Sequence, residues 1–208
     1  MMRSVKPSRA SASTPIQAEH RAPPASPYNR SVPHVIEPAS SARAKCRSCD
    51  QPIAKGELRF GERQPNAFGE GEMTLWFHLP CAAYSRPEPF LETQAAAAGE
   101  DLEPLAAAAR FGIEHRRVPR LHGAERATSG RAHCRSCREL IAKGDWRLSL
   151  VFFEDYRFSP GGYVHAVCAR DYFETIELFE RIRHFSPALS EHDIEQIAAA
   201  MSAGRRTP

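Results

Sequence analysis

Six cysteines and two histidines recur in two copies of one pattern. The phrase RAKCRSCDQPIAKGELRF at 43–60 returns as RAHCRSCRELIAKGDWRL at 131–148, and a His-x2-Cys pair follows each copy. The gap between the Cys-x2-Cys and His-x2-Cys pairs is 28 residues in the first copy (50–77) and 27 in the second (138–164). Three thiolates and one imidazole at such spacing suit a tetrahedral zinc ion. The predicted ligands are Cys46, Cys49, His78 and Cys81 in the first copy, and Cys134, Cys137, His165 and Cys168 in the second.

The cysteine count agrees with two structural zinc ions. Two such sites use all six cysteines of the chain. The alternative, three disulfides in a secreted protein, lacks an apolar secretion signal near the N-terminus and gives no reason for the paired histidines. Four protein ligands leave no coordination position for an activated water, so the predicted role of zinc is folding rather than catalysis. We therefore expect a reducing, intracellular compartment.

The elements that must hold these ligands are short. In the first copy, strands at 57–61 and 74–78 flank a Pro- and Gly-containing loop, and a helical turn beginning at Leu79 carries Cys81. Helices are predicted at 87–97 and 104–110, each opened by proline. The predicted fold class is α+β, with two small zinc-stabilised modules that each combine a short antiparallel sheet with helices.

The second copy has an aromatic-rich insert followed by helices. One helix is predicted over 170–184, because apolar and charged residues alternate there at helical spacing. A second begins at a Ser190–Asp193 cap, and Ile194, Ile197 and Met201 form its apolar face up to Gly204. Histidines outside the ligand sets, including His34, His122 and His184, are expected on the surface.

Composition divides the chain into four parts. Residues 1–42 contain seven prolines and eight serines, have a formal charge of +3, and are predicted to be a disordered basic tail, with a transit peptide as the alternative. The first module is expected at 43–114, a basic linker at 115–130 and the second module at 131–204.

The repeated string resembles the zinc fingers of poly(ADP-ribose) polymerases, which are similar to fingers of certain DNA ligases and DNA 3′-end phosphatases. The resemblance covers about 43–204, although Tyr163 and Val164 replace the aromatic pair in the second copy, which predicts a repacked core there. It implies binding to DNA strand breaks. The residues that carry it are Arg43, Cys46, Cys49, Ile53, Lys55, Gly56, Leu58, Arg59, Trp76, Phe77, His78 and Cys81, then Arg131, Cys134, Cys137, Ile141, Lys143, Gly144, Trp146, Arg147, Tyr163, His165 and Cys168.

The resemblance also implies DNA-contacting residues. By analogy with the family, Arg43, Arg59, Arg131 and Arg147 grip phosphates, for which a planar guanidinium is well suited. Loop residues Phe68, Met73 and Phe158 are the candidates for stacking on the base pair exposed at a break. The alternatives are ordinary surface arginines, since the chain has 24 Arg against 4 Lys, and loop aromatics that belong to the core.

The formal charge differs between the zinc-binding segments and the helical segments that follow them. Residues 43–86 and 115–170 carry formal charges of +2 and +6, whereas 87–114 and 171–208 carry −5 and −3. Positive zinc-binding segments backed by acidic helices favour a phosphate-tracking surface, although solvated helix faces can give the same alternation.

These observations predict a non-enzymatic, zinc-dependent protein that recognises DNA nicks, breaks or ends. The chain has no G-x-S-x-G motif, no P-loop and no cysteine left as a nucleophile. We expect the fingers to act without an ADP-ribosyltransferase domain. A repair enzyme is a possible partner, whereas no membrane or small-molecule substrate is expected. The alternatives are a zinc-scaffolded protein-interaction adaptor and a single-stranded nucleic-acid binder. The Arg/Ala bias favours a bacterial cytoplasm or nucleoid, with the nucleus expected in a eukaryote.

Overall fold

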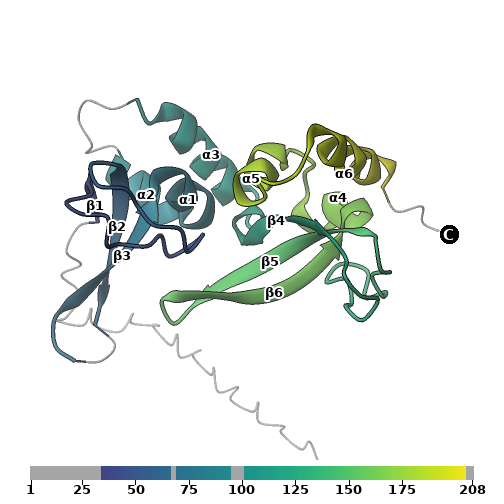
Figure 1. Ribbon diagram of the computed structural model, residues 1–208, viewed down its shortest axis with the longest axis horizontal. Helices are drawn as coiled ribbons and strands as arrows, with labels where there is room; N and C mark the ends of the chain where they lie inside the picture. Colours follow the sequence, from purple (N-terminus) through teal and green to yellow (C-terminus); the bar gives the residue numbers. More distant parts are fainter. Residues whose placement is uncertain (1–33, 67–68, 95–100, 205–208) are drawn as a thin grey trace, which may run out of the picture. The chain divides into compact units, whose positions relative to one another are not determined.

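Two three-stranded antiparallel sheets, each with its own helices, form the fold (Figure 1). The computed structural model describes residues 34–66, 69–94 and 101–204. The elements of the first module are β1 (Val35–Pro38), β2 (Leu58–Pro65), β3 (Glu72–His78), α1 (Leu79–Ser85), α2 (Pro87–Gln94) and α3 (Glu103–Glu114). Those of the second are η1 (Val118–Arg120), β4 (Leu121–Arg126), β5 (Trp146–Glu154), β6 (Arg157–His165), η2 (Ala166–Cys168), α4 (Ala169–Phe173), α5 (Phe179–Phe185) and α6 (Glu191–Ala203). The α+β prediction, with two zinc-type sites, is confirmed.

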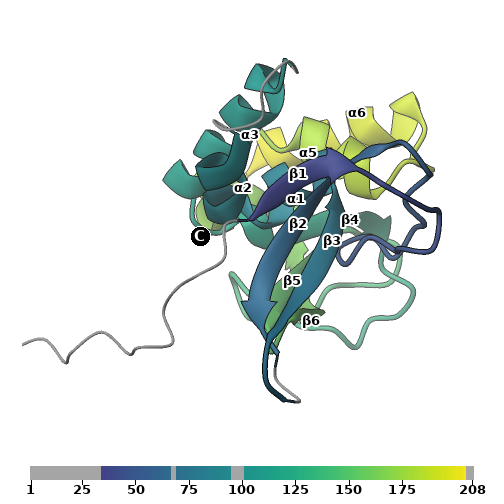
Figure 2. The same ribbon diagram turned by 90° about the vertical axis from the view of Figure 1, so that its left-hand side faces the viewer.

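The first sheet has the order β1-β2-β3, and β2 and β3 form a long hairpin (Figure 2). Phe60 and Phe77 lie opposite each other in this hairpin, both fully buried, with ring centroids 6.0 Å apart. Gly61 faces Trp76, and a Cβ at this position would lie 2.6 Å from the indole ring. Glycine therefore lets the indole lie close against the middle strand.

Helices α1, α2 and α3 complete the core of the first module. Helix α1 begins directly after His78 with a proline in its first turn, so the last strand leads into the helix that carries Cys81. Phe90 of α2 is fully buried and packs edge-on against Phe60 at 6.0 Å. The helix predicted from residue 104 extends to Glu114, because Ala106, Ala109 and Gly112 continue its buried face.

The second sheet repeats this arrangement in the order β4-β5-β6. Leu148 and Val164 lie opposite each other and are fully buried, in the place that Phe60 and Phe77 occupy in the first sheet. The repacked core predicted from the loss of the aromatic pair is thus an aliphatic one. The aromatic-rich insert forms the β5–β6 hairpin, which contains a register shift between Leu150 and Val151.

The helix predicted over 170–184 is wrong as a single element. It consists of α4 and α5, because Glu174 adopts a left-handed conformation (φ 64°) that ends α4. The closing helix agrees with its prediction: Ser190 and Asp193 form a reciprocal capping box, Ile194, Ile197 and Met201 are buried, and α6 ends before Gly204.

Strands β1 and β4 correct the expected boundaries. Strand β1 lies inside the range predicted as a tail, and β4 lies inside the range predicted as a linker. The cause is edge pairing: each strand completes a sheet whose other two strands contain the strong sequence signals. Residues 1–33, which make up most of the predicted tail, lie outside the described residues.

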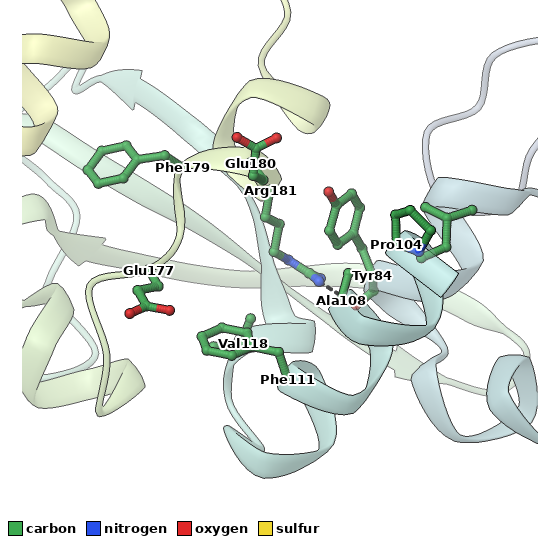
Figure 3. A pocket seen from close by; sticks show the side chains of 10 residues that line it. Tyr84, Pro104, Ala108, Phe111, Val118, Glu177, Phe179, Glu180 and Arg181 are labelled. Carbon is green, nitrogen blue, oxygen red and sulfur yellow. Dashed lines mark hydrogen bonds between the residues drawn. The ribbon is translucent and has the colours of Figure 1, made fainter. Parts of the chain in front are cut away.

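The two modules belong to one compact unit, Val32–Pro208. Arg181 of α5 is 3% exposed and donates hydrogen bonds to three backbone carbonyls, those of Tyr84, Pro119 and Leu121. Figure 3 shows Arg181 extending toward Tyr84 of the first module. Phe158 of the β5–β6 hairpin packs edge-on against Phe77 of the first module at 6.4 Å. These contacts join the modules through both an arginine and an aromatic pair.

Candidate metal centres

The four predicted ligands of the first module converge at one point. The ligand atoms of Cys46, Cys49, His78 and Cys81 all lie within 4.8 Å of one another. Cys46 and Cys49 come from a tight turn in which the Asp50 amide donates to the Cys46 carbonyl at 2.9 Å. His78 ends β3 and Cys81 lies in the first turn of α1, so one strand-to-helix junction supplies the other two ligands.

The orientation of His78 leaves Nδ1 as its ligand atom. Nε2 lies 3.2 Å from the carbonyl oxygen of Pro52, and since a carbonyl can only accept, Nε2 carries the proton. The unprotonated Nδ1 faces the sulfurs, 3.4 Å from Cys49 and 3.8 Å from Cys81. A backbone carbonyl that fixes the tautomer in this way is a usual outer partner of a metal-bound histidine.

The second module reproduces this geometry. Cys134, Cys137, His165 and Cys168 also have their ligand atoms within 4.8 Å of one another. Nε2 of His165 lies 3.2 Å from the Leu140 carbonyl, and Nδ1 faces Cys137 at 3.5 Å. Both ligand sets are thus brought together, and the chain has two Cys3His zinc-binding sites for two structural zinc ions.

The thiols within each cluster shift one another's pKa values. Hydrogen bonds from Cys46 and Cys81 hold the pKa of Cys49 well below its usual value, while the pKa values of Cys46 and Cys81 are raised by their contacts with neighbouring thiols. In the second site, burial raises the pKa of Cys168 to about 12. Three thiolates in so small a volume need a cation to neutralise them, which fits a divalent metal such as zinc.

Arg43 and Arg131, the arginines three residues before each first cysteine, have exposed side chains. They lie at the start of each cysteine turn, where the amides of Ile53 and Ile141 donate to the carbonyls of Ala44 and Ala132. Their position leaves both guanidinium groups accessible to an anion. Their role as phosphate contacts stays a prediction.

Arg59 and Arg147 are held in matching, largely buried arrangements. Arg59 is 7% exposed, donates to Glu37 Oε1 at 2.8 Å, and has its guanidinium carbon 3.4 Å from the ring centroid of Trp76. Its Nε is buried without a hydrogen-bond partner among the described residues.

Arg147 is 6% exposed and donates to Glu125 Oε1 through Nε and Nη2, at 3.0 and 2.6 Å. Its guanidinium carbon lies 3.6 Å from the ring centroid of Tyr163. Both arginines also lie opposite a zinc ligand in the sheet, Arg59 opposite His78 and Arg147 opposite His165. The two arginines thus have the same three types of neighbour: a carboxylate, an aromatic ring and a ligand histidine.

Glu37 and Glu125 belong to these arrangements but were not among the residues predicted from the sequence. Each lies 22 residues before the arginine that it binds, in a strand that was assigned to a tail or a linker. The spacing of the two copies could have identified them, because Glu37 and Glu125 are separated by the same number of residues as Arg59 and Arg147. Conspicuous identity between the two copies begins only at the RAxCRSC phrase, downstream of both glutamates.

The three predicted stacking residues differ in their surroundings. Phe68 lies outside the described residues. Met73 lies in β3, opposite Gln64, and is partly buried against the core of the first module. Phe158 is also partly buried, between Phe77 at 6.4 Å and Phe153 at 4.9 Å. Met73 and Phe158 therefore have packing partners within the protein, and base stacking by any of the three stays a prediction.

Two histidines expected on the surface are instead half-buried at the junction of the modules. Nε2 of His184, in α5, lies 3.1 Å from Sγ of Cys81, a ligand of the first site. His122 donates from Nε2 to the Ser48 carbonyl at 3.1 Å and stacks on Phe185 at 4.7 Å. Burial lowers the pKa of both rings. The second module thus reaches the cysteine turn and a metal ligand of the first.

Comparison with known protein families identifies one finger. Residues 37–107 match the family described as the poly(ADP-ribose) polymerase and DNA-ligase zinc-finger region. The match runs from the second half of β1 into α3, so it includes Glu37 and all four ligands of the first site. The first module is therefore a zinc finger of this type.

Curated relatives are similar to between 26% and 64% of the chain. Poly [ADP-ribose] polymerase 1 of Caenorhabditis elegans is 40% identical over 53 residues, which are 26% of this chain and 6% of that protein. Poly [ADP-ribose] polymerase of Sarcophaga peregrina is 27% identical over 143 residues, covering 59% of this chain and 14% of the relative. Poly [ADP-ribose] polymerase 1 of rice (Oryza sativa subsp. japonica) is 28% identical over 145 residues, covering 64% of this chain and 14% of the relative.

The matched regions thus span about a seventh or less of each relative's length. The relatives named here are all from eukaryotes, which gives no support to the bacterial host favoured from composition. Among the described residues, no helix is both long and apolar enough to cross a membrane.

Proposed function

We propose that the chain is a zinc-dependent DNA-binding protein that recognises strand breaks or ends through two fingers, without catalysis of its own. The observation that carries the proposal is the duplicated arrangement around each zinc site. In each module an exposed arginine precedes the first ligand, and a second arginine, oriented by a glutamate and an aromatic ring, lies opposite the ligand histidine. The family match of residues 37–107 supports this use for the first finger.

The second module extends the proposal to a tandem pair. Its ligands, its Arg–Glu–aromatic arrangement and its sheet order all repeat those of the matched finger. Glu37 and Glu125 bind one side of each guanidinium, and we propose that a DNA phosphate binds another. The exposed Arg43 and Arg131 contact neighbouring phosphates. Such contacts are independent of sequence and weaken steeply with salt.

Selectivity for breaks requires an apolar contact with an exposed base. We assign that contact to Phe68, Met73 and Phe158, because an intact duplex offers no exposed base-pair face. A protein of this kind acts where DNA is kept, in a nucleus or a nucleoid. Recruitment of a repair enzyme belongs to the same proposal.

A binding comparison tests the function. Zinc-loaded protein is titrated with a nicked circle, the same circle ligated closed, and a single strand of equal length, at two salt concentrations. We expect the nicked circle to bind at least tenfold more tightly than the closed one, and a chelator to abolish binding. Equal affinity for nicked and closed circles would refute break recognition. Preference for the single strand would instead favour the single-stranded nucleic-acid binder.

A groove beside Arg181 favours an adaptor function as the second candidate (Figure 3). Its volume is about 560 Å³, and it is mainly apolar, with Leu105, Phe111 and Phe179 among its lining residues. Glu177 and Glu180 also line it, so its chemistry suits an apolar peptide with a basic side chain. If this is the function, Ala108→Glu abolishes a protein interaction that Arg43→Ala and Arg131→Ala leave intact.

A further inference from the structure

A second cavity lies where the two modules meet, on the side of the first cysteine turn. It has a volume of about 540 Å³, within the range of roughly 300–1,000 Å³ typical of small-ligand sites. The first module contributes Lys45–Ser48 and Thr74–Trp76, and the second contributes His122 and part of the β5–β6 hairpin. The His122–Ser48 hydrogen bond and the Phe77–Phe158 contact hold these walls together.

The rim of this cleft is positively charged. Arg47, Arg157 and Lys45 line it with exposed side chains, against the single carboxylate of Asp50. Asp50 lies 3.8 Å from Lys45, so the pair is loosely held. Across the described ranges, no carboxylate comes within ion-pair distance of Arg47 or Arg157. Within the part of the chain that the structure describes, both guanidinium groups are therefore available to bind an anion.

The matching arginine of the second module, Arg135, has a hydrogen-bonded side chain, so a side chain available for an anion is not a general property of the motif. Arg47 and Arg135 each follow the first cysteine of their module, and their amides both donate to the carbonyl of the facing strand, at Trp76 and Tyr163. The Arg135 side chain donates from Nε to the Gly161 carbonyl at 2.9 Å, on its own hairpin. Among the described residues the Arg47 side chain makes no such hydrogen bond, and it lines the cleft.

The remaining lining of the cleft is apolar and aromatic. Leu75 and Val151 contribute aliphatic surface, and Trp76 and Phe158 contribute rings. Arg59 covers one face of Trp76, which fixes the plane of the indole. A cationic rim above an aromatic wall matches the chemistry of a nucleotide, which combines an anionic phosphate with a flat apolar base.

We propose that this cleft takes one unpaired nucleotide at a DNA break, with its phosphate on Arg47 and Arg157 and its base against Trp76 and Phe158. The inference rests on the proposed function and narrows it. The preferred substrate is a nick or gap bearing an unpaired nucleotide, since a fully paired end has no base free to enter. The second module contributes half of the site, so neither finger alone discriminates such ends.

The test compares two substrates that differ only in the unpaired nucleotide. One is a plain nicked duplex and the other carries a single-nucleotide flap of 2-aminopurine, whose fluorescence is quenched when it stacks on an aromatic ring. For the wild type, we expect the flap to bind about tenfold more tightly, as for one base stacked on aromatic side chains, with quenching. In Arg47→Ala/Arg157→Ala the ratio falls to about one and the quenching disappears.

Arg110→Ala/Arg183→Ala is the matched control, because it removes the same two charges from exposed positions of α3 and α5 outside the cleft. This control keeps the flap preference. An equal loss in both double variants would overturn the cleft as a site and leave only a general charge effect.

Zinc content and circular dichroism establish that each variant is folded. A wild type that prefers nicks over closed circles but ignores the flap refutes the cleft while the proposed function stands. A wild type that ignores nicks refutes the proposed function itself. An acidic peptide that displaces the flap with higher affinity would also overturn the nucleotide assignment.

Discussion

Nε2 of His184 lies 3.1 Å from Sγ of Cys81, so a helix of the second module contacts a metal ligand of the first. Burial lowers the pKa of this ring, which is therefore neutral at pH 7 and has one N–H to donate to a thiolate. The rings of Tyr84 and Phe185 hold the imidazole from two sides, at 5.1 and 4.7 Å. Zinc binding at the first site and the packing of the modules are coupled through this contact.

His184→Ala weakens zinc binding at the first site and leaves the second site unchanged. Loss of an outer hydrogen bond to a metal ligand typically reduces affinity by about 10- to 100-fold. Competition for zinc with a chromophoric chelator measures the affinity of each site, because in the variant the first site releases its zinc before the second. His192→Ala, at an exposed position of α6, is the control. Equal weakening of both sites would contradict the contact.

Arg181→Met destabilises the protein by about 2–4 kcal/mol. The guanidinium is fully buried and serves three carbonyls, and burial lowers its pKa to about 9, which still leaves it charged at pH 7. Methionine fills a similar volume but leaves those carbonyls without donors. Urea unfolding in excess zinc measures the change. Arg183→Met, which breaks only an exposed pair with Glu191, costs less than about 1 kcal/mol; similar losses in both variants would count against the carbonyl contacts.

Glu125→Gln raises affinity for nicked DNA by about two- to threefold. The substitution keeps the shape of the side chain but removes a partly exposed negative charge beside Arg147, and such a charge has an effect of about 0.5 kcal/mol. Arg147→Ala lowers the affinity. Fluorescence anisotropy at low and moderate salt measures both variants. If Arg147 has only a structural role, Glu125→Gln leaves the DNA affinity unchanged. An unchanged affinity would therefore exclude Arg147 as a phosphate contact.

Zinc removal unfolds both modules and restores the reactivity of six thiols. Each module depends on a cluster of three thiols that repel one another as thiolates, and zinc is the cation that neutralises them. A thiol reagent added with a chelator should react with all six cysteines, whereas the zinc-loaded protein reacts slowly. Metal analysis should give two zinc ions per chain. A single zinc, or native circular dichroism after chelation, would contradict this account.

The metal centres were predictable from sequence because their signal is local. Cysteine pairs separated by two residues, and a His-x2-Cys pair that follows after 28 or 27 residues, define the ligands without any knowledge of the sheet. The capping box of Ser190 and Asp193 was predictable for the same reason. The two strands of the first hairpin were predictable from the Pro- and Gly-containing loop between them, although their paired ends lie a few residues closer to that loop, at Pro65 and Glu72.

The remaining features depend on contacts between distant parts of the chain. Arg181 looks like any charged residue of an amphipathic helix until three carbonyls surround it. His184 lies 103 residues after Cys81, and no spacing rule connects them. Strand β1 is only four residues long and contains a proline, so its own sequence is too weak to predict it. The pairing partner decides its conformation.

The short outer strands β1 and β4 determine where a fragment that contains a single finger can begin. A fragment that starts at Arg43 or Arg131 would lack β1 or β4, and the middle strand would then expose a bare edge of unpaired amides and carbonyls that favours aggregation. Such a fragment would also lose the carboxylate that orients Arg59 or Arg147. Expression of single fingers should therefore begin upstream of Val35 or Val118.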